Sequence, residues 1–396
     1  NLLASKIFSR TVWILCFVSL FNDIASEMLY PILPVYLKEI GFSVFLIGLL
    51  EGLADVTSGI SKGYFGKLSD ISGRRLPFIR SGYLLSVIAK PMFGMFINPV
   101  WIFFARTFDR FGKGIRTSAR DAMLSDETTK ENKGKVFGLH RGMDTTGAFI
   151  GPIFALVYIY FNPGDYKTMF FLAFAPGAVG LLLTFLIKEK KHTENSKKAD
   201  YNFFSFLKYW KNSPAEYKKV VIGFLFFALM NSSDIFLLLK VKSMGYDDTY
   251  VIGAYIFYNF IYAVVSYPAG VIADKLSMKT VFISGMIMFA VVYFLMSLEL
   301  SFVFIIAAFV IYGLFAASTE GISKAWITNI VSKEDTGTAL GFFLSFNSIC
   351  AMLASAMAGF LWSSYSPSVT FTLSYLGAII TAFYFIFMKS KKIAFE

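Results

Sequence analysis

The sequence is poor in charge and almost devoid of cysteine and histidine. Charged residues make up 16% of its 396 residues, against 56% hydrophobic ones, and only 2 cysteines and 2 histidines occur. A water-soluble protein could not bury that much apolar surface, so the soluble classes are excluded. Cys16 and Cys350 both fall inside apolar runs. Neither a disulfide framework nor a cysteine-based metal site is therefore expected, and nothing indicates a cofactor.

Long apolar runs fill nearly the whole chain. A run of about 18 or more apolar residues can cross roughly 30 Å of hydrocarbon as a helix, and about twelve such runs occur. The predicted fold class is therefore an all-α membrane protein. The expected spans are 11–38, 44–65, 76–97, 100–122, 136–161, 168–188, 218–243, 249–271, 279–298, 301–328, 337–361 and 368–388.

The net charge of +11 does not indicate a nucleic-acid partner, because lysine and arginine lie in the short segments between the apolar runs. Alternate segments are rich in these cations, and the segments between them are nearly bare. By the positive-inside rule, both ends and the long central loop then lie in the cytoplasm. The rich segments carry Lys6, Arg10, Lys67, Arg74, Arg75, Lys130, Lys133, Lys135, Lys188, Lys190, Lys191, Lys197, Lys198, Lys275, Lys279, Lys389, Lys391 and Lys392, and the bare ones mainly Lys38, Lys167 and Lys242.

A polar stretch from Lys188 to Lys219 divides the chain. Aromatic residues and lysines interleave within it, which is typical of a helix that lies in a membrane interface. The expected organisation is an N-terminal six-helix bundle at 1–188, a cytoplasmic linker with an amphipathic helix at 189–217, and a C-terminal six-helix bundle at 218–396.

The two halves repeat the same signals. Gly66 to Asp70 follows a Gly-x-x-small-Asp pattern, and Gly270 to Asp274 repeats it at the equivalent loop. The Asn22-Asp23 pair of the first span is echoed in Asn231-Ser232-Ser233-Asp234 of the seventh. Such internal repeats are typical of transporters, whose substrate site lies near the membrane midplane between the repeats.

The first of these loops resembles the signature of the major facilitator superfamily, G-x-L-[AS]-D-x-x-G-R-[RK], at every defined position from Gly66 to Arg75. The small residues of Gly147 to Pro152 are similar to the glycine-rich fifth helix of that family. Other segments resemble a bacterial subset often labelled nickel-resistance or multidrug-type exporters. These segments are Asn22-Asp23-x-x-Ser26-Glu27-Met28-x-x-Pro31, Glu51-Gly52, Arg106-x-x-Asp109-Arg110-x-Gly112-Lys113-Gly114-x-Arg116, Arg120-Asp121, His140-Arg141 and Glu320-Gly321-x-x-Lys324-Ala325.

The resemblance implies a secondary transporter of the bacterial inner membrane that works by alternating access. We expect it to be a monomer and to export its cargo. In that family the signature loop clamps the two halves at the cytoplasmic side. Near that end, Arg116 and Arg120 are expected either to form gating salt bridges or to extend toward the interface. The expected gating residues are Gly66, Asp70, Gly73, Arg74, Arg75, Arg116, Arg120 and Asp274.

Asp23 and Glu27 are the candidate proton-coupling residues. They are four positions apart and share one face of the first span, near the middle of the bilayer. Two carboxylates cannot both stay ionised cheaply in that environment, which suits uptake and release of a proton. The alternative is that each is permanently paired with a basic residue of another helix.

Further ionisable residues are expected in the cavity, because the first, fourth, seventh and tenth helices line it in the family fold. The candidate substrate-binding residues are Asn22, Arg106, Asp109, Arg110, Lys113, Asp234, Glu320 and Lys324. Their alternative is a structural network, in which Asp109 pairs with Lys113 and Glu320 with Lys324 at helical spacing. For Glu51, Asp55, His140, Arg141 and Asp144 the structural role is the expectation.

The mixture of cationic and anionic groups favours a small polar organic cargo of negative or mixed charge. A carrier of a transition metal would be expected to offer imidazole or thiolate, yet the chain has few of either. Export of a divalent metal by carboxylates remains an alternative, and so does a nontransporting receptor. An enzyme is not expected, since no nucleophile or metal constellation stands out.

Overall fold

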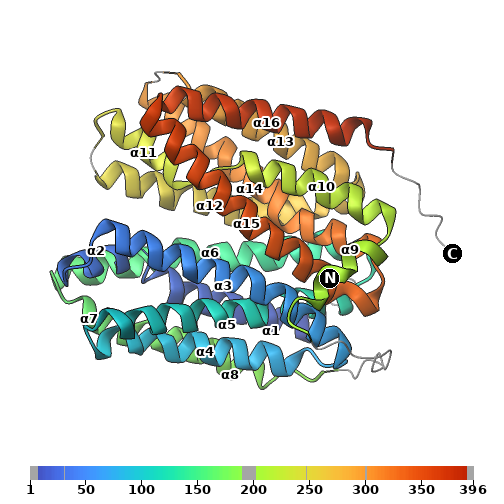
Figure 1. Cartoon of the computed structure of the whole chain (residues 1–396), viewed down its shortest axis with the longest axis horizontal. Coiled ribbons are helices and arrows are strands. Elements are labelled where there is room, and N and C mark those ends of the chain that lie inside the picture. Colours follow the sequence, from blue (N-terminus) through green and yellow to red (C-terminus); the bar gives the residue numbers. More distant parts are fainter. Residues whose placement is uncertain (1–7, 31, 190–201, 247, 299–300, 390–396) are drawn as a thin grey trace, which may run out of the picture.

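The computed structural model describes residues 8–30, 32–189, 202–246, 248–298 and 301–389, and within them it contains helices and no strands (Figure 1). The first half holds α1 Arg10–Glu27, α2 Leu33–Glu39, α3 Val44–Ile71, α4 Leu76–Met95, α5 Pro99–Asp126, η2 Lys130–Asn132, α6 Lys133–Phe161, α7 Tyr166–Leu172 and α8 Phe174–Thr184. The rest holds η3 Ser205–Lys208, α9 Tyr209–Asn212, α10 Ala215–Met230, α11 Ile235–Ser243, α12 Asp248–Lys275, α13 Met278–Met296, α14 Phe302–Ile330, η4 Lys333–Asp335, α15 Thr336–Ser364 and α16 Pro367–Phe387.

Eight segments of the described chain are long and apolar enough to cross a membrane. They are Lys130–Phe161, Tyr166–Thr184, Ala215–Ser243, Gly253–Lys275, Met278–Met296, Val303–Ile330, Lys333–Ser364 and Pro367–Phe387. The long helices α1 and α5, which carry many of the ionisable candidates, lie outside this group. The all-helical membrane class is thus confirmed, while the number of twelve spans stays a prediction.

Two predicted spans are broken where the sequence disfavours a helix. The span 11–38 divides into α1 and α2, and a proline stands in the first turn of α2. The span 218–243 divides into α10 and α11 at residues 231–234, which read Asn-Ser-Ser-Asp. Short polar side chains of this kind compete for backbone hydrogen bonds, and the Ser233 hydroxyl accepts one from Ile235 N at 3.4 Å.

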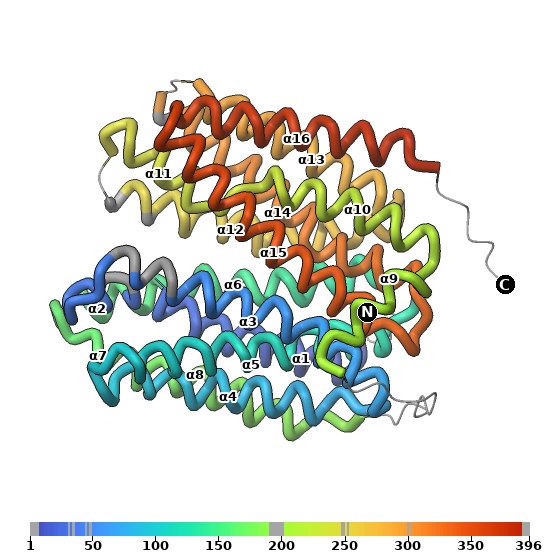
Figure 2. The backbone as a smooth tube through the Cα atoms, viewed as in Figure 1, coloured from blue at the N-terminus to red at the C-terminus, as the bar shows by residue number. Residues whose placement is uncertain are grey.

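The helices gather in two bundles (Figures 1 and 2). Helices α1 to α8 lie together in the lower part of the view, and α10 to α16 lie in the upper part. Within the lower bundle α1 packs on α6 and α8, and α4 on α5; within the upper one α13 packs on α14 and α16. Between the bundles, α3 packs on α15 and α6 on α12.

The bundles meet most closely where α3 and α12 end and α6 and α15 begin. A Cβ added at Gly66 would lie 2.3 Å from the Gly337 carbonyl oxygen, and one added at Gly270 would lie 2.1 Å from that of Gly134. Only glycine permits this approach of two backbones. We call this region the closed end.

Part of the predicted linker also lies at the closed end. Phe206 of η3 is buried, and its ring lies against Gly63 of α3. Trp210 stacks on Phe342 of α15, with ring centroids 5.4 Å apart. These side chains therefore contact both bundles. Residues 190–201, the other part of the predicted linker, lie outside the described residues.

Candidate functional site

A cavity of about 540 Å³ lies between the two bundles. Helices of both bundles line it, and its ionisable residues are more often basic than acidic. The basic ones are Lys62, Arg110, Lys113, Arg116, Arg120, Arg141 and Lys324, and the acidic ones are Asp23, Glu27, Asp144, Asp234 and Glu320. A group of this composition in the interior of a membrane protein is a candidate site by default.

Asp23 and Glu27 face the cavity from α1. Their backbone is held against α6 by two glycines: a Cβ added at Gly147 would lie 2.7 Å from Asp23 Cβ, and one at Gly151 would lie 3.0 Å from Glu27 Cβ. Tyr255 of the other bundle donates a hydrogen bond to Glu27 at 3.2 Å. Within the described residues no cation lies within 4.0 Å of either carboxylate.

Asn22 does not share this face. Its side chain is 3% exposed, and it is absent from the residues that line the cavity. The amide oxygen of Asn22 is buried and has no hydrogen-bond partner among the described residues. The structure thus places Asn22 inside the N-terminal bundle, one position away from the cavity-facing Asp23.

The predicted stripe on α5 divides between the cavity and the bundle interior. Arg110 and Lys113 line the cavity, whereas Arg106 pairs with Glu51 of α3 at 2.5 Å. Asp109 pairs with Lys90 of α4 at 3.0 Å. The alternative in which Asp109 pairs with Lys113 is therefore wrong, because Asp109 pairs with Lys90 of α4 and Lys113 lines the cavity.

Arg110 lies beside two carboxylates of α3, Asp55 at 3.4 Å and Glu51 at 3.7 Å. The expected structural role of these two carboxylates agrees with the pairing. Arg110 still lines the cavity, so its guanidinium is shared between α3 and the open space.

In the C-terminal bundle, Asp234 stands at the break between α10 and α11. Tyr258 and Tyr312 each donate a hydrogen bond to it at 2.5 Å, one to each carboxylate oxygen. Both tyrosines are buried but line the cavity. Asp234 is thus held by hydroxyl groups, and no cation lies within 4.0 Å of it in the described chain.

Glu320 and Lys324 both line the cavity, but they do not pair with each other. Glu320 pairs with Arg141 of α6 at 2.6 Å, and Lys324 pairs with Asp121 of α5 at 2.8 Å. The alternative in which Glu320 pairs with Lys324 is wrong, because each side chain has a partner in the opposite bundle. Both ion pairs therefore join α14 to the N-terminal bundle.

Arg116 and Arg120 lie deeper on α5. Arg116 donates to Ser86 of α4 at 2.6 Å, and its guanidinium lies 4.6 Å from the centre of the Tyr83 ring. Arg120 donates to Asp121 at 2.9 Å and to Ser19 of α1 at 3.1 Å. Both arginines are thus bound within the N-terminal bundle, and both also line the cavity.

Several cavity residues were missed by the sequence analysis. Lys62 of α3 lines the cavity and donates to Ser348 of α15 at 3.2 Å. Lys90, which does not line the cavity, is buried within the N-terminal bundle and pairs with Asp109. The available signal was a lysine within each predicted span, 44–65 for Lys62 and 76–97 for Lys90. The tyrosines around Asp234 gave no comparable signal, since tyrosine is common throughout this chain.

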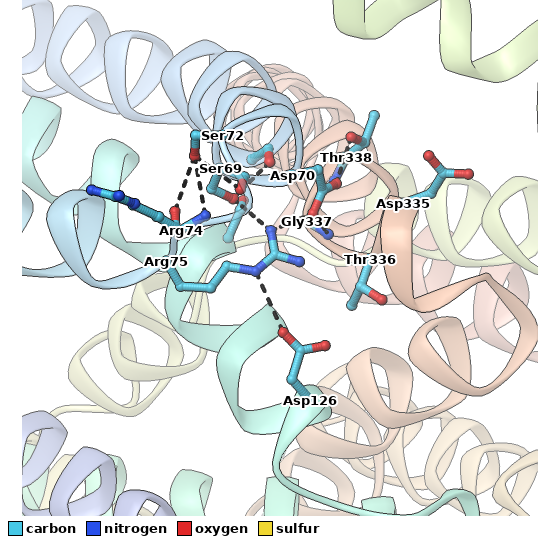
Figure 3. Close-up of polar contacts among 12 residues, drawn as sticks. Ser69, Asp70, Ser72, Arg74, Arg75, Asp126, Asp335, Thr336, Gly337 and Thr338 are labelled. Atoms are coloured by element: carbon cyan, nitrogen blue, oxygen red, sulfur yellow. Dashed lines mark hydrogen bonds and ion pairs between the residues drawn. The ribbon is translucent and has the colours of Figure 1, made fainter. Parts of the chain in front are cut away.

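The signature loop forms a contact between bundles at the closed end (Figure 3). Asp70 accepts hydrogen bonds from Gly337 N at 3.1 Å, Thr338 N at 2.5 Å and the Thr338 hydroxyl at 2.6 Å. It also pairs with Arg75, which reaches Asp126 of α5 at 3.5 Å. A carboxylate at the N-terminus of α15 is favoured by its unpaired amides and by the helix dipole.

The other signature positions support this contact in different ways. Gly73 has φ +61°, a left-handed conformation that glycine adopts without strain. Gly66 allows the approach to Gly337 described above. Arg74 is exposed, and the Ser72 hydroxyl bonds its backbone groups (Figure 3).

Asp274 repeats the arrangement in the other half. It accepts hydrogen bonds from Gly134 N at 2.7 Å and Lys135 N at 2.9 Å, at the N-terminus of α6. The sequence signal for these two receiving helices was missed: Glu131-Asn132-Lys133-Gly134-Lys135-Val136-Phe137-Gly138 corresponds to Glu334-Asp335-Thr336-Gly337-Thr338-Ala339-Leu340-Gly341. Each half thus provides one carboxylate, and this carboxylate binds the N-terminus of a helix in the other half.

Among the residues that the structure describes, no group of three or more histidine, cysteine, aspartate or glutamate side chains is arranged to hold a metal ion.

Comparison with known proteins identifies the family. The Major Facilitator Superfamily model matches residues 15–258 and 249–394. An uncharacterized MFS-type transporter of Methanocaldococcus jannaschii is 32% identical over 386 residues, which cover 96% of this chain and 95% of that protein. Citrate exporter 1 of Aspergillus niger is 25% identical over 177 residues, 44% of this chain and 33% of that protein.

A solved structure has the same fold at low identity. The human organic anion transporter MFSD10 superposes with a TM-score of 0.81 at 13% identity, over 95% of this chain and 99% of that one. With the family model matched across both halves and a relative aligned over nearly its full length, this chain belongs to the Major Facilitator Superfamily and is a multi-pass membrane transporter.

Proposed function

We propose that this chain is a proton-coupled secondary transporter that exports a small polar organic molecule of negative or mixed charge by alternating access. The observation that carries the proposal is the cavity between the bundles. It holds basic residues together with carboxylates that have no cation within 4.0 Å in the described chain. The two bundles contact each other at the closed end of the molecule, on one side of the cavity. Such carboxylates can gain and lose a proton as the surroundings change.

The moving parts are the two six-helix bundles, residues 1–188 and 218–396, with 189–217 as the cytoplasmic linker. Twelve spans follow if α1 with α2, α7 with α8, and α10 with α11 each count as one. Both ends and the closed end face the cytoplasm in this proposal, in the cytoplasmic membrane of the cell, and one chain acts as the transporting unit. The distribution of lysine and arginine supports this orientation.

Proton coupling is assigned to Asp23 and Glu27. They share a helix face and line the cavity, Glu27 accepts a hydrogen bond from Tyr255, and within the described residues no cation lies within 4.0 Å of either carboxylate. Substrate binding is assigned to Arg110, Lys113 and the C-terminal residues Asp234, Glu320 and Lys324. The contacts of Arg106 and Asp109 within the N-terminal bundle favour a supporting role for those two residues.

The experiment is transport in proteoliposomes loaded with a pH-sensitive dye. The probes are citrate, as an anion, and a zwitterionic quinolone, as a molecule of mixed charge. A proton gradient should drive accumulation of at least one probe, and movement of that probe should change the internal pH. Gradient-independent binding without flux would identify a receptor instead, and flux of Ni²⁺ alone would identify a metal exporter.

Variants test the coupling assignment in the same assay. Asp23→Asn or Glu27→Gln should abolish gradient-driven accumulation while part of the downhill exchange remains, since the proton site is lost and the cargo site is not. Asp109→Asn serves as the comparison, because Asp109 lies outside the cavity and pairs with Lys90. Accumulation at the wild-type proton stoichiometry by both single variants contradicts the assignment.

A further inference from the structure

The basic residues of the cavity divide into two groups. Arg110, Arg120, Arg141 and Lys324 each lie within 4.0 Å of a carboxylate. Arg116 has no such partner among the described residues and contacts Ser86 and the Tyr83 ring instead. In the described part of the chain, Lys62 and Lys113 line the cavity with no carboxylate within 4.0 Å, and the only hydrogen bond of the Lys62 ammonium goes to a hydroxyl.

The structure brings these two lysines to the same helix contact. Gly114, next to Lys113 on α5, packs against α3 so closely that an added Cβ would lie 2.5 Å from Ser61 Cβ. Ser61 directly precedes Lys62. The contact continues one turn further along α5, where the Ser118 hydroxyl donates to the Lys62 carbonyl oxygen at 2.9 Å. Lys62 and Lys113 therefore flank one point of contact, and both line the cavity there.

Lys62 also lies next to the contact between the two bundles. It lies on α3 between Gly59 and Gly63, and α15 approaches both glycines: an added Cβ at Gly59 would lie 2.8 Å from Ser348 Cβ, and Gly341 lies against Gly63. From there the contact of α3 with α15 runs on toward the closed end. The two lysines thus lie where α3 and α5 meet α15, so that a molecule bound there would contact both bundles.

Two like charges in a membrane interior repel each other and lack the solvation of bulk water. A ligand that brings one carboxylate to each lysine offsets both costs at once. A ligand with a single carboxylate brings two acceptor oxygens but only one negative charge, which cannot neutralise both ammonium groups. The arrangement therefore discriminates by the number of anionic groups on the cargo as well as by their sign.

We propose that Lys62 and Lys113 form one subsite for two carboxylates of a single cargo molecule, so that the cargo is a small dicarboxylate or tricarboxylate. This inference rests on the proposed transport function and narrows its cargo from a negative or mixed charge to a polyanion. A cavity of about 540 Å³ has room for such a molecule together with water. Phosphate offers similar chemistry to an ammonium group, so the test includes it.

The test is equilibrium binding to the purified full-length protein in detergent, with citrate, succinate, butyrate and inorganic phosphate as probes. Citrate and succinate should bind more tightly than butyrate, which matches succinate in chain length but has one carboxylate. Lys62→Gln and Lys113→Gln should each weaken citrate binding about ten- to hundredfold, the value of one charge-assisted hydrogen bond. In at least one of the two variants, the affinity for butyrate should fall by a smaller factor than the affinity for citrate.

Charge-preserving and distant variants serve as controls. Lys62→Arg and Lys113→Arg should retain most of the citrate binding, which separates loss of charge from loss of fold. Lys219→Gln removes an exposed lysine outside the cavity and should bind citrate as the wild type does. Equal effects of the arginine and glutamine variants on citrate binding would overturn the subsite.

Other outcomes also decide the proposal. Failure of both polycarboxylates to bind, preference for phosphate over both, or citrate binding within twofold of wild type in both glutamine variants overturns it. Proton-coupled quinolone flux in a protein that binds no polycarboxylate would refute the subsite and leave the proposed function standing. Citrate binding that depends on both lysines, without flux of any probe, would support the subsite and refute the transport mechanism.

Discussion

Replacing Asp70 by asparagine tests how the closed end is held. In the structure Asp70 joins α3 to α15 through two backbone amides and one hydroxyl, and it lies beside Arg75. Asparagine has nearly the same shape but no charge, and its amide nitrogen cannot accept a hydrogen bond. We therefore expect the variant to fold and to populate states in which the closed end has opened.

The size of the effect follows from the contacts. A hydrogen bond to a charged group contributes about 1.5–3 kcal/mol, and asparagine loses the charge and at least one acceptor toward α15. Arg75 keeps Asp126 as a partner, which limits the free-energy cost of losing its ion pair with Asp70. A net change of about 2–4 kcal/mol shifts the ratio of closed to open molecules by about thirty- to a thousandfold.

Distances between spin labels across the closed end measure this shift. Glu131 and Lys333 are exposed there, one in each half, and can carry the labels after Cys16 and Cys350 are replaced by alanine. The wild type should show mainly the short distance, and Asp70→Asn should show mainly a longer one. Transport of a probe should slow, because the cycle spends less time closed at this end.

Ser332→Ala is the matched control, since the Ser332 hydroxyl donates to Asp335 beside the same helix start (Figure 3), within its own bundle. It should leave the distance distribution nearly unchanged. If Asp70→Asn also leaves the distribution unchanged, the contact at α15 does not hold the closed end, and the reasoning fails.

Three further outcomes are expected. Asp274→Asn should shift the same label distances in the same direction but less than Asp70→Asn, because Asp274 accepts two backbone hydrogen bonds and no hydroxyl or arginine bond in the described chain. Gly66→Val should open the closed end in the same distance measurement, since even a Cβ would lie 2.3 Å from the Gly337 carbonyl oxygen. Arg110→Ala should weaken binding of citrate by about 1.5–3 kcal/mol in equilibrium dialysis, and Arg110→Lys should also be impaired because an ammonium lacks the planar fork.

Hydrophobic runs were enough to predict the helical membrane class and the approximate positions of the long helices. The repeated Gly-x-x-small-Asp pattern located both contacts at the closed end. The pattern did not predict that these carboxylates bind the helix starts at Gly134 and Gly337. Nothing in the segment of a carboxylate indicates which distant backbone amides it will contact.

Within the cavity, helical spacing predicted the shared face of Asp23 and Glu27. Helical spacing did not predict which residues form ion pairs. Glu320 and Lys324 are correctly spaced to pair along α14, yet each pairs across the bundles. A pair on one helix gains little when stronger partners lie opposite, and that depends on bundle packing. Lys62 was overlooked for the same reason, since its role depends on α5 and α15 beside it.

The ion pairs of the described chain fall into two groups: pairs within one bundle, which a movement of the bundles leaves intact, and pairs between the bundles, which such a movement changes. Lys90–Asp109 and Arg106–Glu51 join helices of one bundle, so they can persist in every state and keep buried charges neutral. Arg141–Glu320 and Lys324–Asp121 join the two bundles beside the cavity. A rotation of one bundle against the other must change the distances in this second group. Charges that cargo or protons place among them therefore alter the balance between states, whereas changes to the first group act mainly on folding.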